Sequence, residues 1–201
     1  MAGVKKYRKT LKKDLIVKAA ELLFNRYGLK RVTVEEICRT AEVSKMTFYK
    51  YFKNKIELIK HLLNQIFSEQ MDEYREIMKK DIPYTEKVKH MIQAKDERTK
   101  TLSQEFINDL YKNPIPEIAE LIEKLKVDAI GEVLRDLQKA SEKGDIRQNI
   151  KPELILYFLN HMREMVKEEK LSHIYSSPNE LIMELTNFFF YGVLPAGNNE
   201  K

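Results

Sequence analysis

The placement of proline is the strongest constraint on how this chain of 201 residues can fold. The six prolines lie at positions 83, 114, 116, 152, 178 and 195, so the first 82 residues contain none. Proline breaks a helix in its interior but is tolerated in its first turn, so this spacing favours long helices with short breaks. No segment shows the sustained alternation of apolar and polar residues that a half-buried strand requires. We therefore expect an all-α fold.

Apolar residues at helical spacing predict the positions of the helices. They are expected at about 12–27, 33–41, 44–52, from 54, at 85–101, 103–112 and 116–143, from 152, and from 178. Thr33 with Glu36, and Ser177 with Glu180, have the spacing of reciprocal helix caps. Gly28 and Gly144 each follow a periodic stretch, as glycines do where a helix ends in the left-handed conformation.

Charge is distributed unevenly along the chain. Residues 1–60 contain 16 lysines and arginines against 6 acidic residues, whereas residues 61–201 contain 20 against 25. The basic end is suited to a polyanion, and Lys5, Lys6, Arg8 and Lys9 form an arm that would reach a DNA backbone or minor groove. The alternative is a solvated basic surface without a partner.

Several classes of protein are disfavoured by what the sequence lacks. Cys38 is the single cysteine, which excludes an intramolecular disulfide. It lies on an apolar helix face, where we expect it to act as a small hydrophobic residue. The alternative is a redox sensor. The N-terminal residues lack a secretory signal, and no apolar run approaches the roughly 20 residues of a membrane helix. We expect a cytoplasmic protein.

Catalytic and metal-binding patterns are also missing from the sequence. The histidines are scattered, no cysteines are paired, and there is no glycine-rich phosphate loop or nucleophile elbow. An enzyme acting on nucleic acid would need a nucleophile or a carboxylate cluster for metal ions. We therefore expect no catalytic residues, no metal and no cofactor.

Residues 33–52, TVEEICRTAEVSKMTFYKYF, predict two short capped helices joined by a tight turn. This is the pattern of a helix-turn-helix, in which the second helix enters the DNA major groove. At 100° per residue, Phe48 and Phe52 share the inward face of the second helix. Met46 and Lys50 then point outward, flanked by Thr47 and Tyr49.

The stretch from Ala19 to Leu58 resembles the DNA-binding domain of the tetracycline-repressor (TetR) family. The shared features are the AA..LF...G opening, the start at Thr33, the Val43-Ser44 turn, Thr47-Phe48-Tyr49, and Phe52-x-Asn54-Lys55. Glu42 departs from the family, which usually has glycine in this turn. A positive φ would cost a non-glycine residue about 1 kcal/mol, so we expect a slightly altered turn. The remaining residues resemble the family in architecture alone.

The resemblance implies a DNA-binding domain at 1–55 and an effector-binding and dimerisation domain at 56–201. It places four residues against bases: Lys45, Met46, Thr47 and Tyr51. It places five against phosphates: Thr33, Ser44, Tyr49, Lys50 and Lys55. Lysine can donate to guanine, and a tyrosine hydroxyl to a phosphate oxygen. The alternatives are solvated lysines, core packing of Tyr49 and Tyr51, and simple helix capping by Thr33.

The last two long helices are apolar on more than one face, with LILYFL at 154–159 and FFFYGVL at 188–194. Such helices are buried on both flanks, and a second subunit would cover the outer one. The resemblance implies a homodimer through a four-helix bundle. The expected interface residues are Leu154, Tyr157, Leu181, Leu185, Phe188 and Phe189. The alternative is a core formed within one chain.

By the same resemblance, the helices at about 85–167 enclose an effector cavity. The candidate lining residues are Met91, Phe106, Leu110, Tyr111, Phe158, His161, Met162 and Met165. His161 is also compatible with a core or interface position. The expected function is a transcriptional repressor that a small, largely apolar effector releases from a palindromic operator in double-stranded DNA. The alternative is a non-catalytic architectural DNA-binding protein.

Overall fold

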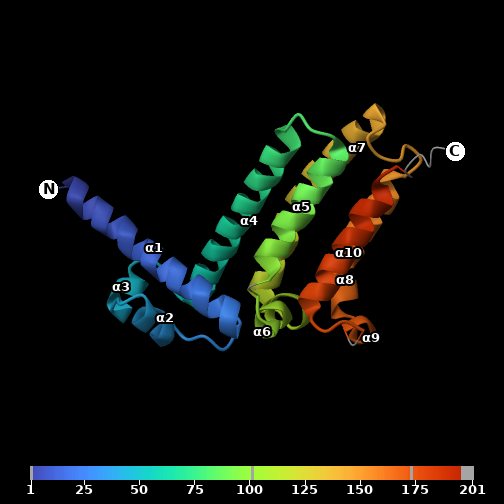
Figure 1. The fold of residues 1–201 in the computed structure, drawn as a ribbon. Helices are drawn as coiled ribbons and strands as arrows, with labels where there is room; N and C mark the ends of the chain where they lie inside the picture. The colour runs from blue at the N-terminus through green and yellow to red at the C-terminus, as the bar shows by residue number, and fades with distance from the viewer. Residues whose placement is uncertain (1, 101, 173, 196–201) are drawn as a thin grey trace. The chain divides into compact units, whose positions relative to one another are not determined.

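The computed structural model describes residues 2–100, 102–172 and 174–195, and only the backbone at 2–10, 163, 167, 169 and 172. Within these residues the chain is helical and contains no strand, so the predicted all-α fold is confirmed (Figure 1). The side chains of the predicted basic arm, Lys5, Lys6, Arg8 and Lys9, lie outside the described residues. The helices are α1 Ala2–Tyr27, α2 Val34–Thr40, α3 Lys45–Tyr49, α4 Lys55–Lys79, α5 Tyr84–Thr99, α6 Gln104–Ile107, η1 Asn108–Lys112, α7 Pro116–Lys143, α8 Pro152–Lys167, α9 Glu169–Ser172 and α10 Pro178–Val193.

The observed helices follow the predicted ones with three differences. Helix α1 begins ten residues before the predicted start, the segment predicted at 103–112 divides into α6 and the π-helix η1, and the short α9 was not predicted. The predicted cap at Thr33 is confirmed: the Glu36 amide donates to Thr33 Oγ1 over 3.2 Å, and the Thr33 amide donates to Glu36 Oε2 over 2.8 Å. At Ser177 only half of the predicted reciprocal cap is observed: the Glu180 amide donates to Ser177 Oγ over 3.2 Å, but Glu180 Oε2 accepts from the Ser176 amide over 2.8 Å.

The chain divides into two compact units that do not follow sequence order. The first unit contains Met1–Ser68 and Thr101–Ile122, and the second contains Glu69–Lys100 and Glu123–Lys201. The first unit therefore extends beyond residue 55, because α6 and the start of α7 pack with the helix-turn-helix. The predicted functional boundary at 55 stays a prediction.

The first unit is built around large apolar side chains from its N-terminal helices. Phe24, Ile37, Phe48 and Leu58 are completely buried in one cluster. Phe106 of α6 joins the same cluster. The DNA-binding segment thus shares a continuous core with a helix that comes fifty residues later in the chain.

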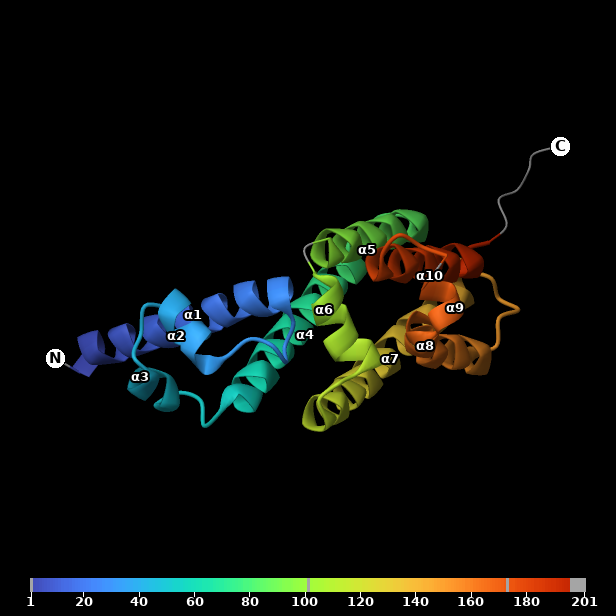
Figure 2. The same cartoon turned by 90° about the horizontal axis from the view of Figure 1, so that it is seen from below.

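In the second unit, α10 packs against both α5 and α8. Figure 2 shows α10 next to α5. Its core cluster joins Val88 of α5 to Leu137 of α7, Ile155 of α8 and Phe189 of α10. No described helix is both long enough and apolar enough to cross a membrane.

Gly28 ends α1 with a φ of +84°, as predicted, and Gly144 follows α7 with a φ of +79°. Space for a side chain is also tight at position 28. A Cβ atom there would lie 2.7 Å from Oδ2 of Asp109 in η1, which is closer than real Cβ contacts. The carboxylate of Asp109 therefore rests directly on the end of α1.

Candidate DNA-binding site

The turn between α2 and α3 retains the geometry that usually calls for glycine. Glu42 has a φ of +53°. Its amide donates to the Arg39 carbonyl over 3.2 Å, and the Val43 amide donates to the Cys38 carbonyl over 2.9 Å. These two bonds form a Schellman ending of α2, with glutamate in the left-handed position. The altered turn that we expected is not observed, because the backbone accepts the strain instead.

We expect Glu42→Gly to raise the free energy of unfolding by about 1 kcal/mol, because glycine adopts a positive φ without the clash that glutamate experiences. Urea denaturation followed by circular dichroism measures the change. Glu120→Gly, on the exposed surface of α7, is the control and should lower stability by about 1 kcal/mol. Loss of stability in both variants would show that the turn at position 42 is not strained.

Helix α3 directs its side chains as the sequence predicted. Phe48 and Phe52 are buried, with ring centroids 5.9 Å apart, whereas Met46 is 70% and Tyr49 55% exposed. Ser44 caps the helix by accepting from the Thr47 amide over 3.1 Å. The buried aromatic side chains therefore hold α3 against the core, and the outward surface of the helix is open to a partner.

Lys45 forms an ion pair with Glu35, which joins the start of α3 to α2. The hydrogen bond from Lys45 is the main reason that the pKa of Glu35 is lowered, and the same bond raises the pKa of Lys45. Both side chains are more than half exposed. To contact a base, the Lys45 ammonium must therefore break its ion pair with Glu35. Breaking a solvent-exposed pair of this kind costs little free energy.

The ammonium of Lys55 is directed into the protein and not along its surface. Lys55 Nζ donates to the carbonyl oxygens of Leu29, Lys30 and Val32 over 2.9, 2.9 and 2.8 Å. Desolvation lowers the pKa of Lys55, and Asp109 opposes this shift. These three bonds use all the ammonium protons. A phosphate contact at this position, which stays a prediction, would come from the backbone amide at the start of α4.

The other predicted contacts differ in exposure. Lys50 and Ser44 are exposed, but Thr47 and Tyr51 are half-buried, and Tyr51 packs against the core of the first unit. The Thr33 hydroxyl is exposed although it serves as a helix cap. Most of the predicted DNA-contacting residues thus lie on α3 or directly beside it, whereas Thr33 lies at the start of α2 and Lys55 at the start of α4.

The loop at 28–32 is held from two sides within the first unit. Lys55 of α4 binds its carbonyls, and the Lys30 amide donates to Asp109 Oδ2 over 2.9 Å. Asp109 lies in η1, and π-helical turns are frequently found at functional sites. This contact between η1 and the loop that follows α1 joins residues 79 positions apart and was not predicted from the sequence.

The predicted effector residues do not lie in one unit. Phe106, Leu110 and Tyr111 belong to the first unit, whereas the remaining five belong to the second. In the second unit, Met91 is buried and Phe158 is half-buried. His161 is exposed: its ring stacks on Tyr157 at 3.9 Å, and its Nδ1 lies 2.7 Å from the Tyr157 carbonyl oxygen. His161 is therefore placed on the outer face of α8.

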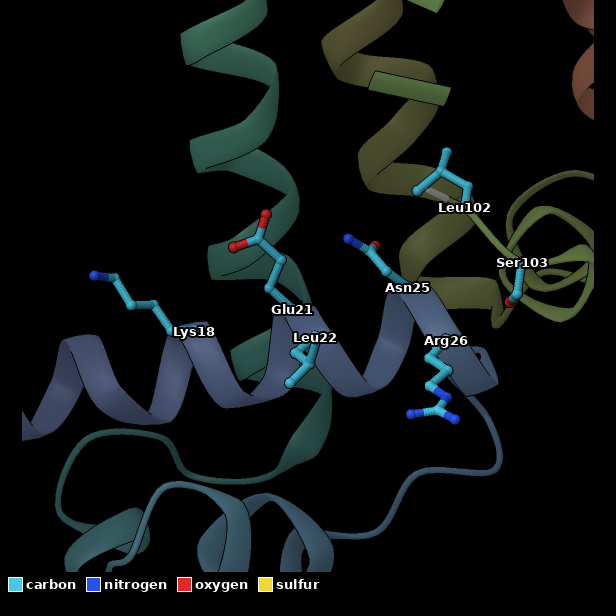
Figure 3. Close-up of a pocket in the computed structure, with 7 residues that line it drawn as sticks. All are labelled: Lys18, Glu21, Leu22, Asn25, Arg26, Leu102 and Ser103. Atoms are coloured by element: carbon cyan, nitrogen blue, oxygen red, sulfur yellow. The ribbon is translucent and has the colours of Figure 1, made fainter. Parts of the chain in front are cut away.

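A cavity of about 570 Å³ lies on the outer side of α1 in the first unit (Figure 3). None of the predicted effector residues lines it. Leu22 contributes an exposed apolar surface, and the Asn25 side-chain oxygen is buried without a hydrogen-bond partner among the described residues. Its lining residues are Lys18, Glu21, Leu22, Asn25, Arg26, Leu102 and Ser103.

The predicted dimer residues separate into two groups. Leu154, Tyr157 and Phe188 are 61%, 63% and 70% exposed on α8 and α10. The other three, Leu181, Leu185 and Phe189, are buried within the chain itself. The exposed group remains available to a second subunit, and the buried group stabilises the single chain.

The structure also bears on redox chemistry at Cys38 and on metal binding. Cys38 is buried, and this burial raises the pKa of its thiol, as expected for a small core residue. In the part of the chain that the structure describes, no three histidine, cysteine or acidic side chains are grouped as metal ligands.

Comparison with known proteins agrees with the helix-turn-helix. Residues 16–62 match the family described as bacterial regulatory proteins, tetR family. An uncharacterized HTH-type transcriptional regulator, YhgD of Bacillus subtilis (strain 168), is 26% identical over 150 residues, which are 74% of this chain and 78% of that protein.

Two solved structures share the fold over nearly the whole chain. FadR of Bacillus halodurans, a fatty acid degradation regulator, has a TM-score of 0.68 at 18% identity and covers 94% of this chain and 97% of its own. A TetR/AcrR-family transcriptional regulator of Thermobifida fusca has a TM-score of 0.62 at 17% identity, with coverage of 94% and 98%. Residues 16–62 therefore match the DNA-binding domain of TetR-family transcriptional regulators, and the chain as a whole shares the fold of solved members of that family.

Proposed function

We propose that this protein is a repressor that binds a palindromic operator as a homodimer and is released by a small, largely apolar effector. The observation that carries the proposal is the outer surface of α3. Met46 and Tyr49 are both exposed there, beside the cations Lys45 and Lys50, and the opposite side of the helix is fixed by buried Phe48. Such a surface fits a recognition helix in the major groove.

The contacts follow from the direction of each side chain. Lys45 and Met46 point outward at the start of α3 and address base edges, with Thr47 beside them. Tyr49, Lys50, Ser44 and Thr33 bind phosphates around the groove. Tyr51 is half-buried, so only its hydroxyl end is assigned to a base.

The dimer forms through the exposed parts of α8 and α10. Leu154, Tyr157 and Phe188 are large apolar side chains that stay more than half exposed in the single chain. Two copies related by a two-fold axis would cover them in an isologous contact. The same symmetry places two α3 helices on the half-sites of a palindrome.

The effector acts through the loop at 28–32. Leu110 and Tyr111 neighbour Asp109 in η1, and Asp109 holds the Lys30 amide over 2.9 Å. An effector that repacks η1 moves Asp109 and so shifts the end of α1 and the segment that leads to α2. An apolar effector is supported by the name of FadR as a fatty acid degradation regulator.

The central test is operator binding by Lys45→Ala. We expect the variant to bind an operator, selected from random duplexes by the parent protein, about 5- to 150-fold more weakly, because one base contact is lost. Fluorescence anisotropy measures the affinity, and circular dichroism verifies the fold. The control Lys124→Ala removes the same charge from an exposed site on α7 and should bind within about twofold of the parent.

A footprint separates the repressor from an architectural protein. Protection of one palindrome, with Lys45→Ala weakening that site more than random DNA, supports the repressor. Uniform coating of DNA, or equal binding by Lys45→Ala and the parent, would contradict it.

A further inference from the structure

Helix α1 carries a row of exposed leucines on the side that faces away from the core. Leu11, Leu15 and Leu22, here called the leucine row, are 52%, 42% and 62% exposed. On the opposite side of the helix, Ile16 and Phe24 are completely buried. At 100° per residue, the three leucines lie within about 40° of one another around the helix axis. Exposed leucines are ordinary when they are scattered, but these three are aligned.

The spacing of the leucine row is that of a coiled-coil seam. Successive members of this seam are four, three, four and three residues apart: Leu11, Leu15, Lys18, Leu22 and Asn25. This alternation keeps one side of a helix against a partner helix along its length. A single lysine is tolerated in such a seam and fixes its register, and the aliphatic stem of Lys18 bridges Leu15 and Leu22. The spacing therefore favours another helix as the partner.

The cavity beside α1 is lined by the same seam. Four of its lining residues follow one another at i, i+3, i+4 and i+7 along the helix (Figure 3): Lys18, Glu21, Leu22 and Asn25. In coiled coils, four neighbouring residues of one helix form the hole that receives a side chain of the facing helix. Leu102, which precedes α6, contributes a further apolar wall. The cavity is thus placed to receive one side chain of a partner helix.

The charges around the seam favour a second copy of α1 in the antiparallel direction. Among the side chains that the structure describes, Asp14 and Lys18 take part in no ion pair. In a parallel pair, Lys18 would face Lys18 of the second copy, and like charges repel. An antiparallel pair whose two-fold axis passes beside residues 16 and 17 instead places Lys18 next to Leu15 and Asp14 of the second copy. The surface is therefore self-complementary, as a two-fold contact between identical chains requires.

The same register fits the cavity. It places Leu11 of the second copy opposite Leu22, at the middle of the four residues that line the cavity. The two-fold axis repeats this contact at the other end of the pair. One arrangement thus covers the leucine row, fills the cavity and brings opposite charges together.

We propose that α1 joins two copies of this chain that belong to neighbouring dimers on one DNA duplex, by antiparallel pairing of the leucine row. The inference rests on the proposed function, since these are the α8–α10 dimers that bind operators. Three leucines from each copy form a small contact beside the roughly 800 Å² that each partner buries in a standard interface. The contact therefore takes effect where DNA holds two dimers close together and raises their effective concentration. It makes binding to two adjacent operators cooperative.

The test measures binding of the full chain to duplexes that carry two copies of the selected operator. Their separation is varied by single base pairs over about one helical turn of 10 base pairs. At favourable separations, occupation of one operator should raise the affinity for the other about 5- to 150-fold. Leu22→Asp should abolish this coupling, because it places a charge against Leu11 of the second copy, and should leave the affinity for a single operator within about twofold. Val127→Asp, at an apolar position of α7 that is 68% exposed, is the control and should retain the coupling.

Two further experiments test the register. Leu11→Cys and Leu22→Cys proteins, mixed and oxidised, should form a disulfide between chains faster than either protein alone, because these positions face each other only in the antiparallel pair. Cys38 is buried and the pKa of its thiol is raised, so it stays out of this reaction. Lys18→Glu should abolish the coupling on DNA, and the combined Asp14→Lys and Lys18→Glu variant should restore it, because opposite charges again meet.

Each outcome decides the proposal. Coupling that Leu22→Asp loses and Val127→Asp retains supports the pairing of α1. Absence of coupling at every separation, or coupling that Leu22→Asp retains, would overturn it. A mixture of the cysteine variants that reacts no faster than Leu11→Cys alone would overturn the antiparallel register. Binding to anionic phospholipid vesicles that Leu22→Asp loses, without coupling on DNA, would assign the leucine row to a membrane surface instead. The affinity for a single operator tests the repressor independently of these results.

Discussion

Lys55→Met is expected to lower the free energy of unfolding by about 3 kcal/mol, because it leaves three carbonyl oxygens without their donor. Methionine preserves most of the buried stem, so the loss reports the ammonium and not a cavity. The oxygens belong to Leu29, Lys30 and Val32, all within 2.9 Å of Nζ, and two of these bonds are partly buried. Urea denaturation followed by circular dichroism measures the change.

Two further variants calibrate this result. Lys60→Met removes a charge from the same helix, where Lys60 makes only a 3.4 Å ion pair with Glu57, and should cost less than about 0.5 kcal/mol. Asp109→Asn weakens the single bond from the Lys30 amide and should cost about 1 kcal/mol. A Lys55→Met variant as stable as Lys60→Met would show that the carbonyl contacts are dispensable. Weaker binding to all DNA sequences in that stable variant would restore the predicted phosphate contact.

Features fixed by neighbouring residues were predictable from the sequence. The caps at Thr33 and Ser177 depend on residues three positions apart, and the inward direction of Phe48 and Phe52 depends on helical periodicity. The contacts of Lys55 span 23 to 26 residues and end on backbone oxygens, which carry no sequence signature. One signal was present: a lysine in the first turn of a helix opposes the helix dipole, so a specific partner was to be expected.

In the second unit, helical periodicity did not predict which helix faces are buried within the chain. A helix that is apolar nearly all round does not reveal which face meets its own chain, so the predicted interface mixed exposed Phe188 with buried Phe189. The same ambiguity affected His161, whose apolar neighbours suggested a cavity although its ring is exposed and stacked on Tyr157.

Adjacent phenylalanines of α10 should therefore respond differently to the same substitution. We expect Phe188→Asp to raise the dimer dissociation constant on the order of 1,000-fold, since each of the two copies would place a charge in the proposed α8–α10 interface. Phe188 is 70% exposed in the single chain, so the fold should persist. Sedimentation equilibrium measures the dissociation constant, and circular dichroism the fold.

Phe189→Asp should instead lower the free energy of unfolding by about 3–5 kcal/mol, because it places an unpaired charge in the core. Phe189 is 7% exposed and lies 5.7 Å from the ring of Phe158 and 5.2 Å from that of Phe190. Since operator binding by two α3 helices requires the dimer, a folded, monomeric Phe188→Asp should also lose most of its operator affinity. A Phe188→Asp protein that stays dimeric at micromolar concentration, or a parent that is monomeric there, would show that this surface does not hold the dimer together.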